Sequence, residues 1–112
     1  MSYKIKSRIW IEVDNTTFLG EGRVRLLKSI KETKSLSKSA RDLGMSYKKA
    51  WNLIDSVNTK ADKPVVVKTA GGLGGGGTTL TEYGLELIKI YETVNTNCWV
   101  YLDKQLKKYL LD

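Results

Sequence analysis

The sequence predicts a mainly helical α+β domain with the element order β-α-α-α-β-β-α. Three observations lead to this class: two short apolar repeats of helical spacing on either side of Gly44, a β-branched and glycine-rich stretch after them, and a long amphipathic segment at the end. Apolar residues three or four positions apart share one face of a helix, whereas alternation or β-branched runs favour strands. The 112 residues are enough for one domain, 1–112.

The N-terminal segment predicts a strand followed by a helix. Residues 3–13 alternate apolar and charged side chains, a period of two that indicates a strand with one buried face. Residues 14–17 have turn composition, and a helix is expected over 21–33. Val24, Leu27 and Ile30 form its inner stripe.

Residues 36–59 predict a helix-turn-helix. Apolar residues recur at helical spacing in both halves, and Gly44 separates them. Glycine adopts the left-handed conformation that ends a helix at little cost, and Ser46 is a good N-cap for the second helix. The apolar positions are Leu36, Ala40 and Leu43, then Ala50, Ile54 and Val57. The second helix therefore turns Tyr47, Lys48, Lys49 and Asn52 outward.

Residues 64–80 predict a β-hairpin beside this motif. Pro64 ends the preceding helix, 65–69 is a β-branched strand, and 78–80 returns after a glycine-rich tip at 71–77. A hairpin in this position makes a winged helix-turn-helix. Trp51 has two interpretations, packing against the hairpin or contact with a ligand, and the first is favoured.

Residues 82–110 predict one long helix with Thr81 as its N-cap. About 28 residues span roughly 42 Å, more than a domain of this size needs to cover its core. A broad apolar stripe on such a helix suggests pairing with a second copy. The alternative is a helix that breaks near residues 95–97. The predicted dimer interface is Ile88, Tyr91, Val94, Cys98, Trp99 and Leu102.

The net charge of +7 is concentrated in one part of the chain. Residues 23–68 hold twelve basic and four acidic residues, a net charge of +8, whereas 1–22 are neutral and 69–112 carry −1. A basic segment that coincides with a helix-turn-helix favours DNA as the partner. The plain alternative is a solvated basic face.

Composition argues against an enzyme and against a bound cofactor. The chain has no histidine and a single cysteine, which excludes histidine-based catalytic sites and zinc sites. The glycine run lacks the Gly-Lys-Ser/Thr ending of a phosphate-binding loop. No signal peptide or apolar stretch of about 18 residues is present, so a cytoplasmic location is expected.

The predicted DNA contacts lie on both helices of the helix-turn-helix and on the hairpin. Lysine can bind phosphate or guanine, and asparagine can form two hydrogen bonds with adenine in the major groove. An ordinary exposed helix face is the alternative for these residues. The predicted contacts are Ser46, Tyr47, Lys48, Lys49, Asn52, Lys38, Arg41, Lys68, Gly74 and Gly75.

Several motifs together resemble the N-terminal DNA-binding domain of the ModE-type molybdate-responsive transcription regulators. They are FLGEGR (18–23), SAR (39–41), GMSYKKAW (44–51), GGLGGGG (71–77) and LTEYG (80–84). The resemblance covers 3 to about 94. It implies a homodimeric winged helix on a two-fold operator, with a recognition helix that begins at Ser46 and the glycine run as the wing.

Two departures from that family matter. Leu73 stands where the family usually has a basic residue, which removes one expected phosphate contact. The chain ends at Asp112, so a stand-alone form without the molybdate-binding domains is expected, and molybdate sensing does not carry over. The leading hypothesis is a DNA-binding regulator. The alternatives are a winged-helix dimerisation or adaptor module without specific DNA binding, and an oxyanion sensor.

Overall fold

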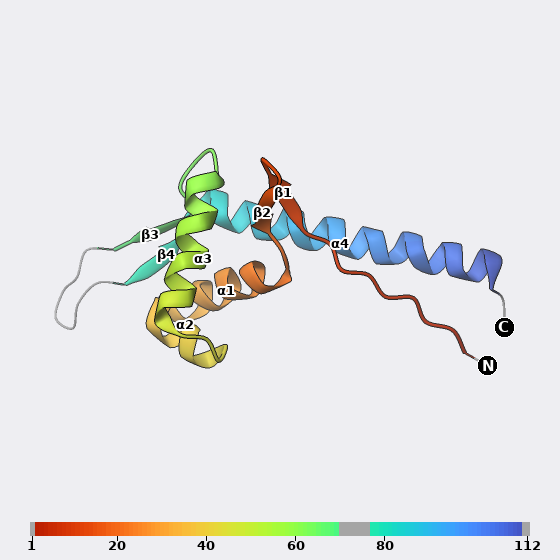
Figure 1. The fold of residues 1–112 in the computed structure, drawn as a ribbon, viewed down its shortest axis with the longest axis horizontal. Coiled ribbons are helices and arrows are strands. Elements are labelled where there is room, and N and C mark those ends of the chain that lie inside the picture. Colours follow the sequence, from red (N-terminus) through yellow and green to blue (C-terminus); the bar gives the residue numbers. More distant parts are fainter. Residues whose placement is uncertain (1, 70–76, 111–112) are drawn as a thin grey trace.

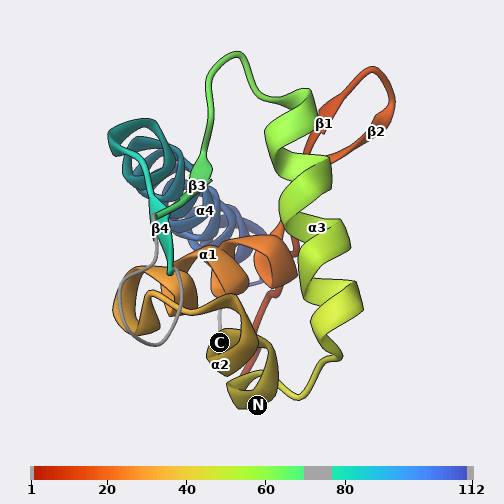
Figure 2. The same ribbon diagram turned by 90° about the vertical axis from the view of Figure 1, so that its left-hand side faces the viewer.

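The computed structural model describes residues 2–69 and 77–110, which form four helices and four short strands (Figures 1 and 2). The mainly helical winged helix-turn-helix predicted from the sequence is confirmed, with one additional strand near the N-terminus. In order, the elements are β1 (Ile11–Val13), β2 (Thr16–Leu19), α1 (Glu21–Thr33), α2 (Leu36–Asp42), α3 (Tyr47–Lys60), β3 (Val66–Lys68), β4 (Thr78–Leu80) and α4 (Glu82–Tyr109).

Helix α1 is the centre of the core, because it contacts α2, α3, α4 and β4. Its inner stripe of Val24, Leu27 and Ile30 is buried as predicted, and Leu26 is buried beside it. The helix-turn-helix packs on one side of α1 and the first half of α4 on another (Figure 2). Burial of this stripe therefore holds the helix-turn-helix to the rest of the chain.

The predicted strand over 3–13 is wrong for residues 3–10. Only Ile11–Val13 pairs, with β2 as its antiparallel partner. The backbone reverses at Asp14 and Asn15, which both adopt positive φ, and β2 then ends at Leu19. Within the described residues, 2–10 pair with no strand and run instead beside α4 (Figure 1). The Ile9 carbonyl accepts a 2.9 Å hydrogen bond from the Tyr91 hydroxyl in the first half of that helix.

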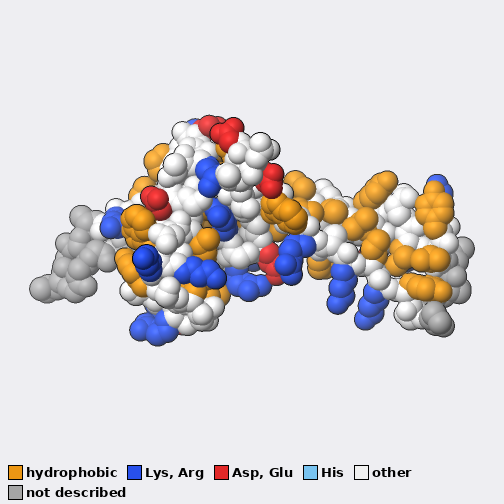
Figure 3. Space-filling model, viewed as in Figure 1, with side chains coloured by type: hydrophobic (Ala, Val, Ile, Leu, Met, Phe, Trp, Pro, Cys, Tyr) orange, Lys and Arg blue, Asp and Glu red, His pale blue; other side chains and the backbone are white. Residues whose placement is uncertain are grey.

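Helix α4 runs without a break through residues 95–97, so the alternative of a broken helix is wrong. Its buried residues are Gly84, Leu87, Ile88 and Tyr91, all in the first ten positions. The remainder extends beyond the core, and in Figure 3 it shows broad hydrophobic patches. Among the helices described, none has the length and apolarity that a membrane span requires.

Two of the predicted dimer residues, Ile88 and Tyr91, are buried within this chain. They are only 7% and 4% exposed, because they pack in the core of this chain. Val94 and Trp99 are 50% and 53% exposed. Cys98 and Leu102 are partly exposed, and the Cys98 sulfur lies 3.9 Å from the Ser7 hydroxyl of the N-terminal segment.

Candidate nucleic-acid interface

The turn between α2 and α3 has the geometry that its sequence predicts. Gly44 adopts φ +69°, and the Met45 amide donates to the Ala40 carbonyl at 2.9 Å, which closes the end of α2. The Ser46 hydroxyl accepts a hydrogen bond from the Lys49 amide at 3.1 Å and caps α3. The N-terminal turn of α3 is therefore held in one orientation relative to α2.

The two faces of α3 are divided as the spacing predicts. Ala50, Ile54 and Val57 are buried in the core. The opposite face is open to solvent, and its exposed members are Tyr47, Lys48, Lys49 and Asn52. In the described part of the chain, no side-chain hydrogen bond or ion pair holds the Lys48, Lys49 or Asn52 side chains. These groups are free to donate hydrogen bonds to a ligand.

Basic side chains extend this surface onto the neighbouring elements. Lys38 and Arg41 are exposed on α2, and Lys68 is exposed on β3. Figure 3 shows Lys and Arg side chains over α2 and the first part of α3, with acidic side chains towards the C-terminal end of α3. The predicted contacts at Gly74 and Gly75, like Leu73, lie outside the described residues.

The Trp51 side chain of α3 lies beside the hairpin. It lines a shallow hollow of about 120 Å³ together with Ile54, Val67 and Lys68, and it is 43% exposed. This position agrees with the favoured prediction of packing beside the hairpin.

Two polar anchors of α3 are absent from the residues predicted from the sequence. The Arg23 guanidinium of α1 donates to the Ser56 hydroxyl at 2.9 Å, and partial burial lowers the pKa of Arg23 from its ordinary value. Asn58 joins α3 to β3. Neither residue stands out from its neighbours in the sequence, because its partners are remote or are backbone groups.

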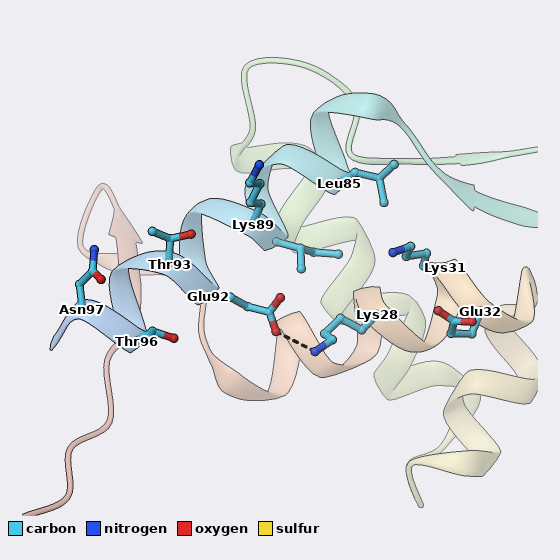
Figure 4. A pocket seen from close by; sticks show the side chains of 10 residues that line it. Lys28, Lys31, Glu32, Leu85, Lys89, Glu92, Thr93, Thr96 and Asn97 are labelled. Atoms are coloured by element: carbon cyan, nitrogen blue, oxygen red, sulfur yellow. Dashed lines mark hydrogen bonds and ion pairs between the residues drawn. The ribbon is translucent and has the colours of Figure 1, made fainter. Parts of the chain in front are cut away.

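A larger hollow of about 660 Å³ lies between α1 and α4 (Figure 4). Lys28, Lys31 and Lys89 line it, but so do Glu32 and Glu92. The Lys28 ammonium group is paired with Glu92 at 2.7 Å, and Lys89 points away from this pair (Figure 4). The three ammonium groups therefore do not converge on one point as an oxyanion site would require.

In residues 2–69 and 77–110, no group of three or more acidic, cysteine or histidine residues is placed to hold a metal ion. The basic surface around α3 is therefore the candidate site with the most coherent chemistry.

Most of the chain is similar in sequence to known proteins. The chain is 38% identical over 98 residues to a molybdenum transport protein ModE from Azotobacter vinelandii, which covers 88% of this chain and 36% of that protein. It is 39% identical over 82 residues to the DNA-binding transcriptional dual regulator ModE of Escherichia coli, over 73% of this chain and 31% of that protein. This chain is a ModE homologue.

Other similarities add to the ModE relation. The molybdenum-pterin-binding protein MopB of Rhodobacter capsulatus is 38% identical over 94 residues, which are 84% of this chain and 35% of MopB. The chain thus spans about a third of the length of these curated relatives. No protein-family model matches it.

A solved structure supports the fold alone. A LysR family transcriptional regulator superposes with a TM-score of 0.55 at 15% sequence identity, over 81% of this chain and 30% of that one.

Proposed function

We propose that this chain is a DNA-binding transcription regulator that binds a two-fold operator as a homodimer. The observation that carries the proposal is the solvent-facing row of Tyr47, Lys48, Lys49 and Asn52 at the start of α3, within the segment of net charge +8. A helix in this motif inserts its N-terminal residues into the major groove. Relatives that are named as transcriptional regulators support a regulatory rather than an enzymatic role.

Each group of basic residues has a role in this proposal. Lys48, Lys49 and Asn52 contact base edges and phosphates in the major groove, while Ser46 holds the helix end and Tyr47 packs on the sugar-phosphate backbone. Lys38 and Arg41 of α2 bind phosphates beside the groove. Lys68 binds the backbone from the hairpin, where Gly74 and Gly75 remain predicted contacts.

The exposed apolar surface of α4 supports the proposed dimer. Its second half leaves Val94 and Trp99 half exposed, beyond the part that covers the core. Two copies joined there would present two α3 helices to half-sites roughly 34 Å apart, one turn of duplex DNA.

The test measures duplex binding as salt is raised. Operators are first selected from a random duplex pool, and affinity is then measured by fluorescence anisotropy at several salt concentrations. Each phosphate neutralised adds about 0.9 to the slope of log affinity against log salt. We expect Lys48→Ala with Lys49→Ala to weaken binding at least about tenfold and to lower this slope.

The matched control is Lys104→Ala with Lys107→Ala, which removes the same charge from the exposed second half of α4. It should change affinity much less. Equal losses in the two proteins would mean that only net charge matters. Parent-like binding by the Lys48, Lys49 variant would reject the α3 assignment, and a stable protein partner with no selected duplex would favour an adaptor.

A further inference from the structure

Asn58 links the DNA-facing helix to the hairpin through three hydrogen bonds. Its carbonyl oxygen Oδ1 accepts from the Val65 amide at 2.8 Å and from the Val66 amide at 3.1 Å. Its Nδ2 group donates to the Val66 carbonyl at 2.9 Å. One side chain of α3 thus satisfies three backbone groups at the start of β3.

The chemistry of this contact requires an amide. Two backbone donors and one backbone acceptor face the side chain, so the carbonyl oxygen and the amino group of Asn58 can be arranged in only one way. Aspartate would accept both hydrogen bonds but could not donate to the Val66 carbonyl. Alanine would leave all three partly buried groups without this partner.

Along the chain, Asn58 lies between two predicted DNA contacts, Asn52 of α3 and Lys68 of β3. It lies six residues after Asn52, roughly 9 Å along α3. Lys68 follows Val66 by two positions in β3, and both α3 and β3 border the hollow beside Trp51. Movement of β3 relative to α3 would therefore change the distance between Lys68 and the α3 face.

Other contacts hold the hairpin to different elements. The Thr78 amide donates to the Lys34 carbonyl at 3.0 Å, and the Thr81 hydroxyl at the start of α4 donates to the Pro64 carbonyl at 2.7 Å. Within the described residues, Asn58 is the α3 side chain that hydrogen-bonds to the hairpin strands or the residue before them. The orientation of β3 relative to α3 depends on it most directly.

We propose that Asn58 is a positioning residue, which holds the hairpin at the offset from α3 that lets both bind one duplex together. This inference rests on the proposed DNA binding. It assigns Asn58 no contact with DNA. Substitution of Asn58 should therefore remove the contribution of Lys68 to DNA affinity, while Lys48 and Lys49 keep their contacts with DNA.

A double-mutant cycle tests this coupling. Lys68→Ala should weaken binding by the parent about threefold, as expected for one phosphate contact. In an Asn58→Ala protein the same Lys68→Ala change should have almost no effect, because the hairpin no longer delivers that contact. Equal effects of Lys68→Ala in both proteins would overturn the proposal, since a merely stabilising role predicts additive losses.

A measurement without DNA separates this inference from the proposed function. Amide hydrogen exchange at β3 should become at least about tenfold faster in Asn58→Ala, while the amides of α3 keep their protection. In Asn58→Asp, the exchange rate at β3 should lie between those of the parent and of Asn58→Ala, because aspartate keeps the acceptor and loses the donor. Thr59→Ala is the control, since among the residues that the structure describes the Thr59 hydroxyl bonds to the Asp55 carbonyl of its own helix and not to the hairpin.

Unchanged exchange at β3 in Asn58→Ala would overturn the inference, whatever the DNA result. If the parent binds no duplex, the proposed function fails, and exchange still decides whether Asn58 holds β3 to α3. Circular dichroism of each variant checks that the helices remain folded.

Discussion

At the scale of single residues, a glycine is required where another segment's backbone lies too close to leave room for a Cβ atom. Gly84 in the first turn of α4 packs against the residue before β3, and a Cβ atom built on it would lie 2.5 Å from the Val65 carbonyl oxygen. Real side chains do not approach backbone that closely. Gly22 in α1, by contrast, would place a Cβ atom in open space.

These two glycines predict opposite effects of alanine. Gly84→Ala should destabilise the fold by about 1–3 kcal/mol through overpacking, more than the gain in helix propensity of about 1 kcal/mol returns. Gly22→Ala should be neutral or stabilising by up to about 1 kcal/mol, because only the propensity changes. Urea unfolding followed by circular dichroism measures both, and a parent-like midpoint for Gly84→Ala would contradict the close approach.

At the scale of elements, the turn between α2 and α3 depends on backbone conformation more than on contacts. Gly44 has φ +69° and open space around its Cα atom, so the conformational cost of a side chain is the only penalty there. The Ser46 cap then starts α3 directly after the turn. The orientation of the proposed DNA-binding helix follows from these neighbouring residues.

Graded substitutions at Gly44 test that interpretation. Gly44→Ala should lower the free energy of unfolding by about 1–2 kcal/mol, the cost of the left-handed conformation for a residue with a Cβ atom. Gly44→Asn should cost less, because asparagine adopts this region more readily. Thermal unfolding of the parent and the two variants measures the order of their stabilities. Equal losses for the two residues would indicate that steric contact, and not φ, sets the penalty.

At the scale of the whole molecule, α4 gives the chain its elongated shape, with a longest extent of 60 Å. The segment 2–10 runs beside this helix (Figure 1). The first ten residues of the helix cover the core, and the remainder carries exposed apolar side chains such as Val94 and Trp99. Such a surface is unfavourable in water unless another surface covers it. The proposed dimer would cover it.

Sedimentation velocity tests this arrangement. Val94→Glu with Trp99→Glu should shift the protein to monomer, because two charges would be buried at the interface, while the fold persists since both side chains are exposed. Glu86→Lys, exposed on the first half of α4, is the control and should leave the dimer intact. A parent that is monomeric at all concentrations, or a dimer that the double variant preserves, would reject this interface.

Local signals in the sequence were sufficient for most elements. Periodic apolar residues predicted α1, α2, α3 and α4, and Gly44, Ser46 and Thr81 marked helix ends by their own backbone and side-chain chemistry. The outward direction of Lys48, Lys49 and Asn52 followed from the inward direction of Ala50 and Ile54 on the same helix. Each of these inferences used residues within a few positions of one another.

The predictions that failed depended on distant partners. Alternation over 3–13 could not reveal that only three residues would find a neighbouring strand. An apolar stripe on α4 could not show that Ile88 and Tyr91 face the core of their own chain. The pairing of Asn58 with Val65 and Val66, likewise, has no sequence signal, because backbone groups of any residue type can serve as partners.

The sequence by itself therefore determined the helices, their caps, the hairpin and the basic character of the α3 surface, since propensity, periodicity and charge act locally. Only the tertiary structure decided which apolar face of α4 is buried in the core and which polar groups join α3 to the hairpin. Burial and hydrogen bonding depend on what lies opposite a side chain in space, and that is set by the packing of the whole chain.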